Sequence, residues 1–77
     1  MTARLEDLLR QQFPNARFED GADLQVGSFA EWTSLAHFNF LLLVEEAYEV
    51  RFGVDEMSEL KSLRDIRGRL AAFGIEA

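Results

Sequence analysis

The stretch EWTSLAHFNFLLLVEEAYEVRF, residues 31–52, decides the fold of this chain. From residue 35 to residue 52 it contains neither Gly nor Pro, and large apolar residues recur every four positions at Phe40, Val44, Tyr48 and Phe52. That period predicts a helix over residues 35–52 with these four side chains in the core. Gly53 follows directly and is expected to end the helix, because glycine readily adopts the left-handed conformation of a helix stop.

Two hydroxyl residues, Thr33 and Ser34, precede this helix, and several roles are open to them. Either could cap the helix by accepting a hydrogen bond from an unpaired backbone N–H of the first turn. Ser34 could also carry an attached group, or act as a nucleophile with His37, three positions on, as its base. Only Glu45, two turns further along, could orient that imidazole. We therefore expect no enzymatic activity and no catalytic residue, and we expect His37 to be a half-exposed surface side chain.

Shorter helices are predicted on both sides of the central one. The first spans residues 3–13, with Thr2 as its cap and an apolar stripe formed by Leu5, Leu8, Leu9 and Phe13. Residues 14–31 are expected to form a long loop that packs across the helices through Phe18, Leu24, Val26 and Phe29. A short helix is predicted over residues 54–60. The last helix starts at the cap Ser62, with Asp65 in a capping box and a core face of Leu63, Ile66, Leu70 and Phe73.

These elements predict an all-α fold in one domain over residues 1–77. Its architecture is expected to be a small four-helix bundle, with three main helices, a short third helix and a long loop between helices one and two. With 48% hydrophobic residues but no Cys, the core must depend on large side chains rather than on disulfides.

The composition also limits chemistry and location. A chain with no Cys and one His lacks the ligands of a structural zinc site, so we expect no metal. Its longest apolar run, residues 40–44, is five residues long, whereas a membrane span needs about 20. The start MTARLEDLLRQQ lacks the apolar core of a signal peptide. We expect a cytoplasmic, monomeric protein that does not enter a membrane.

Charge is distributed unevenly along the chain. The net charge is −6, but residues 18–60 contain ten acids and one base, Arg51, and so carry −9. Nucleic acids are bound by exchanging their counterions for Lys and Arg, which makes them poor partners for this acidic segment. A protein with a basic surface is a better one.

Together these features resemble the acyl carrier proteins. The similarity rests on W-T-S-L-A-H-F-N-F-L-L-L-V-E-E-A-Y-E-V-R-F and on K-S-L-R-D-I, at residues 32–52 and 61–66. Shared features are a serine that opens a long apolar helix, a pair of glutamates, a following aromatic, and a hydroxyl residue with leucine at the start of the last helix. The order of elements extends the resemblance over nearly the whole chain. Ala36 and Asn39 stand where the family often has acids, so the chain looks like a specialised stand-alone carrier.

The resemblance implies a covalent cofactor on Ser34. A phosphopantetheinyl transferase would attach 4′-phosphopantetheine from coenzyme A, and the thiol of this arm would hold acyl or aminoacyl groups as thioesters. The partners would be that transferase, a loading ligase, and downstream biosynthetic enzymes with basic docking patches. The partner-facing residues would be Thr33, Leu35, Phe38, Leu42, Glu45, Glu46 and Glu49. For Phe38 and Leu42, a place in the core is an equal alternative.

One departure from the family pattern bears directly on the modification of Ser34. The family has an aspartate before the serine, where this chain has Thr33. The resemblance assigns that aspartate a part in holding magnesium during modification, and a threonine is a poor ligand for this cation. The alternative is therefore a carrier-like interaction module that is not phosphopantetheinylated.

Overall fold

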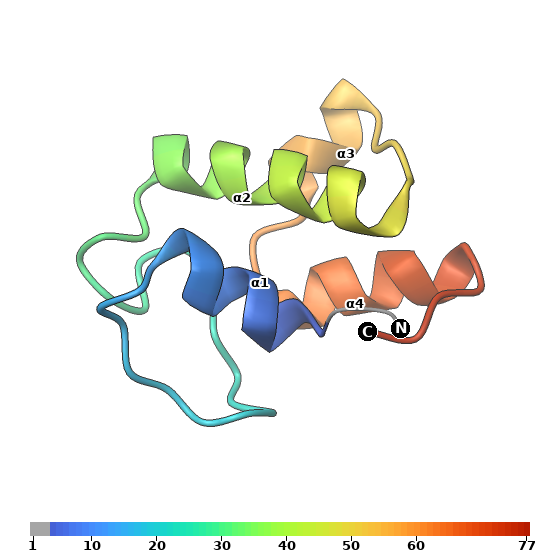
Figure 1. The fold of residues 1–77 in the computed structure, drawn as a ribbon. Helices are drawn as coiled ribbons and strands as arrows, with labels where there is room; N and C mark the ends of the chain where they lie inside the picture. The colour runs from blue at the N-terminus through green and yellow to red at the C-terminus, as the bar shows by residue number, and fades with distance from the viewer. Residues whose placement is uncertain (1–3) are drawn as a thin grey trace.

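A computed structural model describes residues 4–77, and within them the chain forms four α-helices and no strand. The helices are α1 (Leu5–Gln12), α2 (Ser34–Tyr48), α3 (Val54–Glu59) and α4 (Leu63–Ala72). In Figure 1, α2 lies above α1 and α4, and α3 lies beside α2. The all-α prediction is confirmed. The radius of gyration of 11.4 Å is close to the value of about 11–12 Å for a compact chain of this length.

One face each of α1, α2 and α4 forms the core. Its buried members are Leu5, Leu8 and Leu9 of α1, Phe40, Leu41, Val44 and Tyr48 of α2, and Leu63, Ile66 and Leu70 of α4. Each such side chain contributes about 1.5–3 kcal/mol by leaving water. Phe13 and Phe52 are buried too, so the predicted stripes of the first two helices are confirmed.

The prediction for Phe73 is wrong, because this side chain is 42% exposed. Helix α4 ends at Ala72, so Phe73 lies beyond its last turn. The ring contacts the edge of the core instead. Its centroid is 6.4 Å from that of Phe52, and the Arg69 guanidinium lies 4.6 Å above it.

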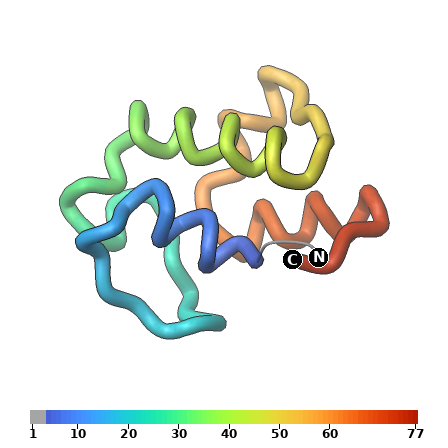
Figure 2. Tube along the Cα trace, in the orientation of Figure 1, coloured from blue at the N-terminus to red at the C-terminus, as the bar shows by residue number. Residues whose placement is uncertain are grey.

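The segment between α1 and α2 is the long loop expected, and Figure 2 shows it curving around the end of the molecule where α2 begins. Its apolar residues Phe18, Leu24, Val26 and Phe29 are partly buried against the core, as predicted. Two backbone hydrogen bonds tie it to the junction of α3 and α4. Val26 N–H donates to the Lys61 carbonyl at 2.9 Å, and Leu63 N–H donates to the Leu24 carbonyl at 2.9 Å.

The first helix is shorter than predicted. It begins at Leu5 and ends at Gln12, with Arg4 at the N-cap position and no side-chain capping bond. The predicted cap, Thr2, lies outside the described residues. The predicted third helix over residues 54–60 is confirmed to within one residue.

The predicted end of α2 is wrong. The helix stops at Tyr48, because Glu49 adopts the left-handed conformation (φ 56°, ψ 46°) that was assigned to Gly53. Two groups of Glu45, in the last turn of α2, accept hydrogen bonds from backbone N–H groups that follow this early stop. The Glu45 carbonyl accepts a hydrogen bond from Val50 N–H (3.1 Å), and the Glu45 carboxylate accepts one from Phe52 N–H (2.7 Å). Gly53 is instead the residue before α3.

The cap of α4 is as predicted, with one difference. The Ser62 hydroxyl accepts a hydrogen bond from Asp65 N–H at 3.1 Å. The Asp65 carboxylate accepts a hydrogen bond from Lys61 N–H at 3.2 Å. In a capping box it would accept this bond from the N–H of the cap residue, Ser62, instead. Among residues 4–77, no helix has both the length and the apolar character needed to cross a membrane.

Candidate functional site

Ser34 is the first residue of α2, and the role of helix cap falls to its neighbour Thr33. The Thr33 hydroxyl accepts a hydrogen bond from Ala36 N–H at 3.2 Å, and its backbone is extended (φ −84°, ψ 173°) as a capping residue requires. Ser34 is exposed, and its hydroxyl makes no hydrogen bond to any part of residues 4–77. The structure therefore needs no capping function from Ser34, and its hydroxyl faces solvent on the first turn of the longest helix.

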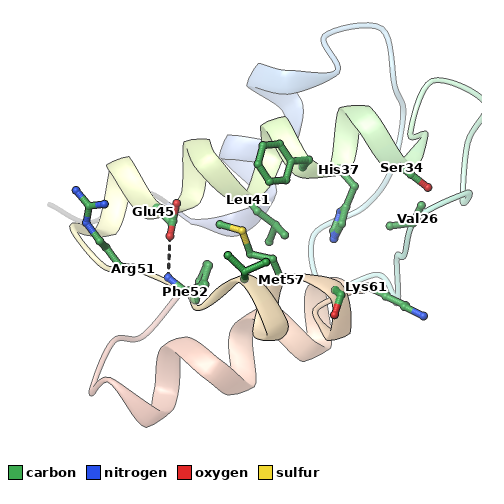
Figure 3. A pocket seen from close by; sticks show the side chains of 12 residues that line it. Val26, Ser34, His37, Leu41, Glu45, Arg51, Phe52, Met57 and Lys61 are labelled. Atoms are coloured by element: carbon green, nitrogen blue, oxygen red, sulfur yellow. Dashed lines mark hydrogen bonds between the residues drawn. The ribbon is translucent and has the colours of Figure 1, made fainter.

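A groove of about 770 Å³ extends from Ser34 between α2 and α3. Its walls are mainly apolar and include Val26, Phe38, Leu41, Phe52, Val54 and Met57. Figure 3 shows Ser34 at one end, near Val26 and Lys61, and Glu45 with Arg51 at the opposite end. The apolar groove thus begins beside the exposed hydroxyl of Ser34 and ends at the charged side chains of Glu45 and Arg51.

His37 lies within this groove, but it is not the half-exposed residue that we expected. Its side chain is only 6% exposed. The indole Nε1–H of Trp32 donates to His37 Nδ1 at 2.9 Å, and His37 Nε2 is hydrogen-bonded to the Leu60 carbonyl. Burial lowers the pKa of His37 below its ordinary value of 6.5, although the Leu60 carbonyl acts in the opposite direction. His37 is therefore a buried, neutral imidazole in the Nε2–H form.

These bonds bear directly on a Ser34–His37 pair. A general base needs a lone pair within reach of the hydroxyl proton. In neutral His37 the only ring lone pair is on Nδ1, and Trp32 occupies it. The other nitrogen carries its proton toward Leu60. Neither ring nitrogen can accept a proton from Ser34 in this arrangement.

The burial of His37 could have been predicted from the sequence. Residue 37 is three and four positions before Phe40 and Leu41, so it shares the buried face of α2. The partners could not be identified in this way, because Leu60 is 23 residues away and Trp32 lies outside the helix. A buried indole N–H requires an acceptor, which makes Trp32 informative once it is known to be 1% exposed.

The exposed face of α2 carries three large apolar residues. Leu35, Phe38 and Leu42 are 73%, 47% and 42% exposed, so Phe38 and Leu42 do not belong to the core. The spacing of three and then four places them in one stripe along the helix. Exposed Val54, at the start of α3, also lines the groove that this stripe borders.

The predicted acidic residues gather at the C-terminal end of the same helix. Glu45, Glu46 and Glu49, together with Leu42, line a second hollow of about 460 Å³. Glu46 and Glu49 are exposed, whereas Glu45 is partly buried and its carboxylate is bound by Phe52 N–H. The structure thus brings the predicted partner-facing residues onto one side of α2, with Glu45 partly committed to the fold.

Comparison with protein-family models, curated proteins and solved structures finds no match for this chain. Within residues 4–77, no three acidic or histidine side chains gather in a way that could hold a metal ion.

Proposed function

We propose that this protein is an acyl carrier, with 4′-phosphopantetheine attached through a phosphodiester to the Ser34 hydroxyl. The observation that carries the proposal is the position of Ser34. It is an exposed, unbonded hydroxyl at the first turn of α2, and it stands at the mouth of an apolar groove. Thr33 performs the capping that would otherwise explain a hydroxyl residue here. The unpaired amides and the positive end of the helix also favour the negative charge of a phosphodiester.

The groove supports a role in handling apolar thioesters. A chain attached at Ser34 has a channel with walls of Phe38, Leu41 and Met57 next to its anchor. Burial of each methylene in such a channel is worth about 0.8 kcal/mol. The compact four-helix arrangement is, in this proposal, a small bundle that holds the anchor and the groove in fixed relation.

The exposed side of α2 supports the partner role. Leu35, Phe38 and Leu42 offer apolar contacts near the anchor, and Glu46 and Glu49 offer negative charge further along the helix. A transferase, a loading ligase and later enzymes with basic patches would bind this side through small, transient interfaces. Weak binding suits a protein that must pass its cargo from one enzyme to the next.

Modification in vitro tests the proposal. The purified chain is incubated with coenzyme A, magnesium and a phosphopantetheinyl transferase of broad specificity, and its intact mass is measured. We expect the mass to rise by one phosphopantetheine group, and we expect no rise in Ser34→Ala. Ser58→Ala is the matched control, because Ser58 also lines the groove but donates its hydroxyl hydrogen bond to the Asp55 carbonyl at 2.7 Å. The proposal would be overturned if the mass increase disappeared in Ser58→Ala but persisted in Ser34→Ala. It would also be overturned if several transferases gave no mass increase in the natural chain.

Thr33 supports the second candidate, an interaction module with this fold that is not modified. The threonine supplies the cap but no carboxylate for a metal ion in the transferase complex. Thr33→Asp separates the candidates, since aspartate can also cap the helix. If the missing carboxylate limits the reaction, Thr33→Asp is modified faster than the natural sequence, as measured by the initial rate of the mass change. Modification of Thr33→Asp but never of the natural chain would favour the interaction module.

A further inference from the structure

His37 joins two segments that face each other across the groove. Its ring accepts a hydrogen bond from Trp32, just before α2, and is bonded to the carbonyl of Leu60, just after α3. Trp32 is in turn fixed among aromatic rings, with centroid distances of 5.4 Å to Phe29 and 6.0 Å to Phe40. The imidazole is therefore anchored on the α2 side and holds the end of α3.

Helix α3 has few other attachments. None of its six residues is fully buried. Within residues 4–77, its other polar link to a distant element is the ion pair of Glu56 with Arg69 of α4, with a shortest distance of 2.8 Å. This pair secures the middle of α3 to α4. At the end of α3, the Leu60 side chain is buried and Val26 N–H donates to the Lys61 carbonyl, while the bond between His37 and Leu60 is the polar link from this end to α2. Elements with little buried surface and few anchors open most easily.

We propose that His37 is a positioning residue, a proton-sensitive clasp that holds α3 against α2 and sets the width of the groove beside Ser34. The clasp works only with a neutral ring, in which Nδ1 accepts from Trp32 and Nε2–H donates to Leu60. A proton added at Nδ1 would face the indole N–H, so that two donors would oppose each other in a buried site. The ring must then turn away from Trp32. Because both nitrogens belong to one rigid ring, this turn also carries Nε2 away from the Leu60 carbonyl, and the link from α2 to the end of α3 is lost. The proposal concerns the groove itself and holds whether or not Ser34 is modified.

The direction of the pH effect follows from burial. The pKa of His37 is lowered in the closed form, while a solvent-exposed ring in an open form has an ordinary value near 6.5. The open form therefore binds the proton more readily, and it gains population as the pH falls below that value. The other charged groups along the groove are Glu45 of α2, Arg51 after α2 and Lys61 after α3. The Trp32 side of the ring faces aromatic neighbours.

The chain is well suited to a test, because it contains one Trp and one His. Trp32 fluorescence and the binding of 8-anilinonaphthalene-1-sulfonate, a probe of exposed apolar surface, are recorded from about pH 7.5 to pH 5, where His is the main titrating side chain. We expect both signals to change together in a one-proton transition with a midpoint below 6.5. The control is His37→Gln, which can donate to the Leu60 carbonyl but does not titrate, and both signals should stay flat. A flat response in the natural chain, or the same transition in His37→Gln, would overturn the proposal.

A second measurement does not depend on how well that variant folds. The ¹⁵N spectrum of the His37 ring reports its tautomer and its pKa in the natural chain and in Trp32→Phe. We expect the Nε2–H tautomer in the natural chain. In Trp32→Phe, which removes the indole donor and makes Nδ1 available to a proton, we expect an upward shift of the midpoint toward 6.5. An Nδ1–H tautomer in the natural chain would contradict the clasp, as would an unchanged midpoint in a folded Trp32→Phe.

Discussion

At the scale of single residues, Glu6 fixes three segments through one carboxylate. It is 1% exposed, accepts a hydrogen bond from Gly21 N–H in the loop at 3.0 Å, and pairs with Arg67 of α4 at 2.9 Å. Burial alone would raise the pKa of Glu6. The Gly21 N–H and the Arg67 guanidinium are among the groups that outweigh this effect, and the pKa lies below its ordinary value of 4.5.

Glu6→Gln should therefore destabilise the fold. It leaves Arg67 without its counter-charge, and we expect the free energy of unfolding at pH 7 to fall by about 1–3 kcal/mol in urea denaturation. Because the folded-state pKa is lowered, the contribution of Glu6 is present above its unfolded-state value and is lost as the pH falls through the folded-state value. The difference between the two proteins should shrink on acidification.

Asp7→Asn is the matched control for Glu6→Gln. Asp7 is the next residue, with its side chain 58% exposed and 3.7 Å from Arg10. Its substitution should change the free energy of unfolding by no more than about 0.5 kcal/mol. A Glu6→Gln effect that is equally small, or that does not depend on pH, would contradict the role assigned to the carboxylate.

The buried polar side chains are where prediction from sequence failed at this scale. The large apolar residues of the helix stripes, apart from Phe73, are placed correctly because their period of three to four is a local property. Glu6 and His37 lie on buried faces too, but what makes their burial tolerable is a partner elsewhere in the chain. Arg67 is 61 residues from Glu6. A charged or polar residue in an apolar stripe is predicted to face solvent unless its partner is known.

At the scale of elements, α4 has a weak point at Gly68. This glycine is in the interior of the helix, and a Cβ built on it meets nothing within 4 Å. Glycine in a helix interior costs about 0.8–1 kcal/mol relative to alanine. Gly68→Ala should therefore raise the free energy of unfolding by up to about 1 kcal/mol, measured by urea denaturation.

Gly27→Ala provides the contrast for that substitution. The site is equally open, but Gly27 has φ of +90°, which alanine rarely adopts. We expect Gly27→Ala to lower the stability. A shift of stability in the same direction for both substitutions would contradict the role given to the backbone conformation of the two glycines.

Element boundaries were less predictable than element identities. Three of the four helices follow from periodicity, but α2 ends four residues earlier than expected. The sequence offered Gly53 as the stop, and an acidic residue in the left-handed conformation at Glu49 has no local signature. What stabilises this early end is the Glu45 carboxylate on Phe52 N–H, seven residues away.

At the scale of the whole molecule, ion pairs determine which of the charges in the sequence remain available to a partner. Four of the six arginines outside residues 18–60 form ion pairs with acids, namely Arg4, Arg10, Arg67 and Arg69. Arg4 and Arg10 both pair with Asp20, at 2.8 Å and 2.7 Å, and Arg69 pairs with Glu56 at 2.8 Å. Glu46 and Glu49, by contrast, have no ion pair within residues 4–77. The negative charge on α2 is thus left available to a partner.

If this charge steers partners, the transferase reaction should depend on salt. We expect Glu46→Gln/Glu49→Gln to lower the second-order rate constant of modification by up to roughly tenfold at low ionic strength. The difference should narrow as salt is added, since screening weakens exposed charges. Glu76→Gln is the control, because it removes an exposed acid after α4. An equal effect in this control would point to net charge rather than to the surface of α2.

The central claim is that Ser34 carries the cofactor, and locating the added mass tests it most directly. After incubation with coenzyme A and the transferase, the protein is digested with trypsin and the peptides are sequenced by tandem mass spectrometry. Cleavage after Arg17 and Arg51 leaves Ser28, Thr33 and Ser34 in one peptide, residues 18–51, whose fragments distinguish them. We predict a phosphopantetheine group on Ser34. The same group on Ser28, Thr33 or Ser58, or its absence from every peptide, would contradict this account.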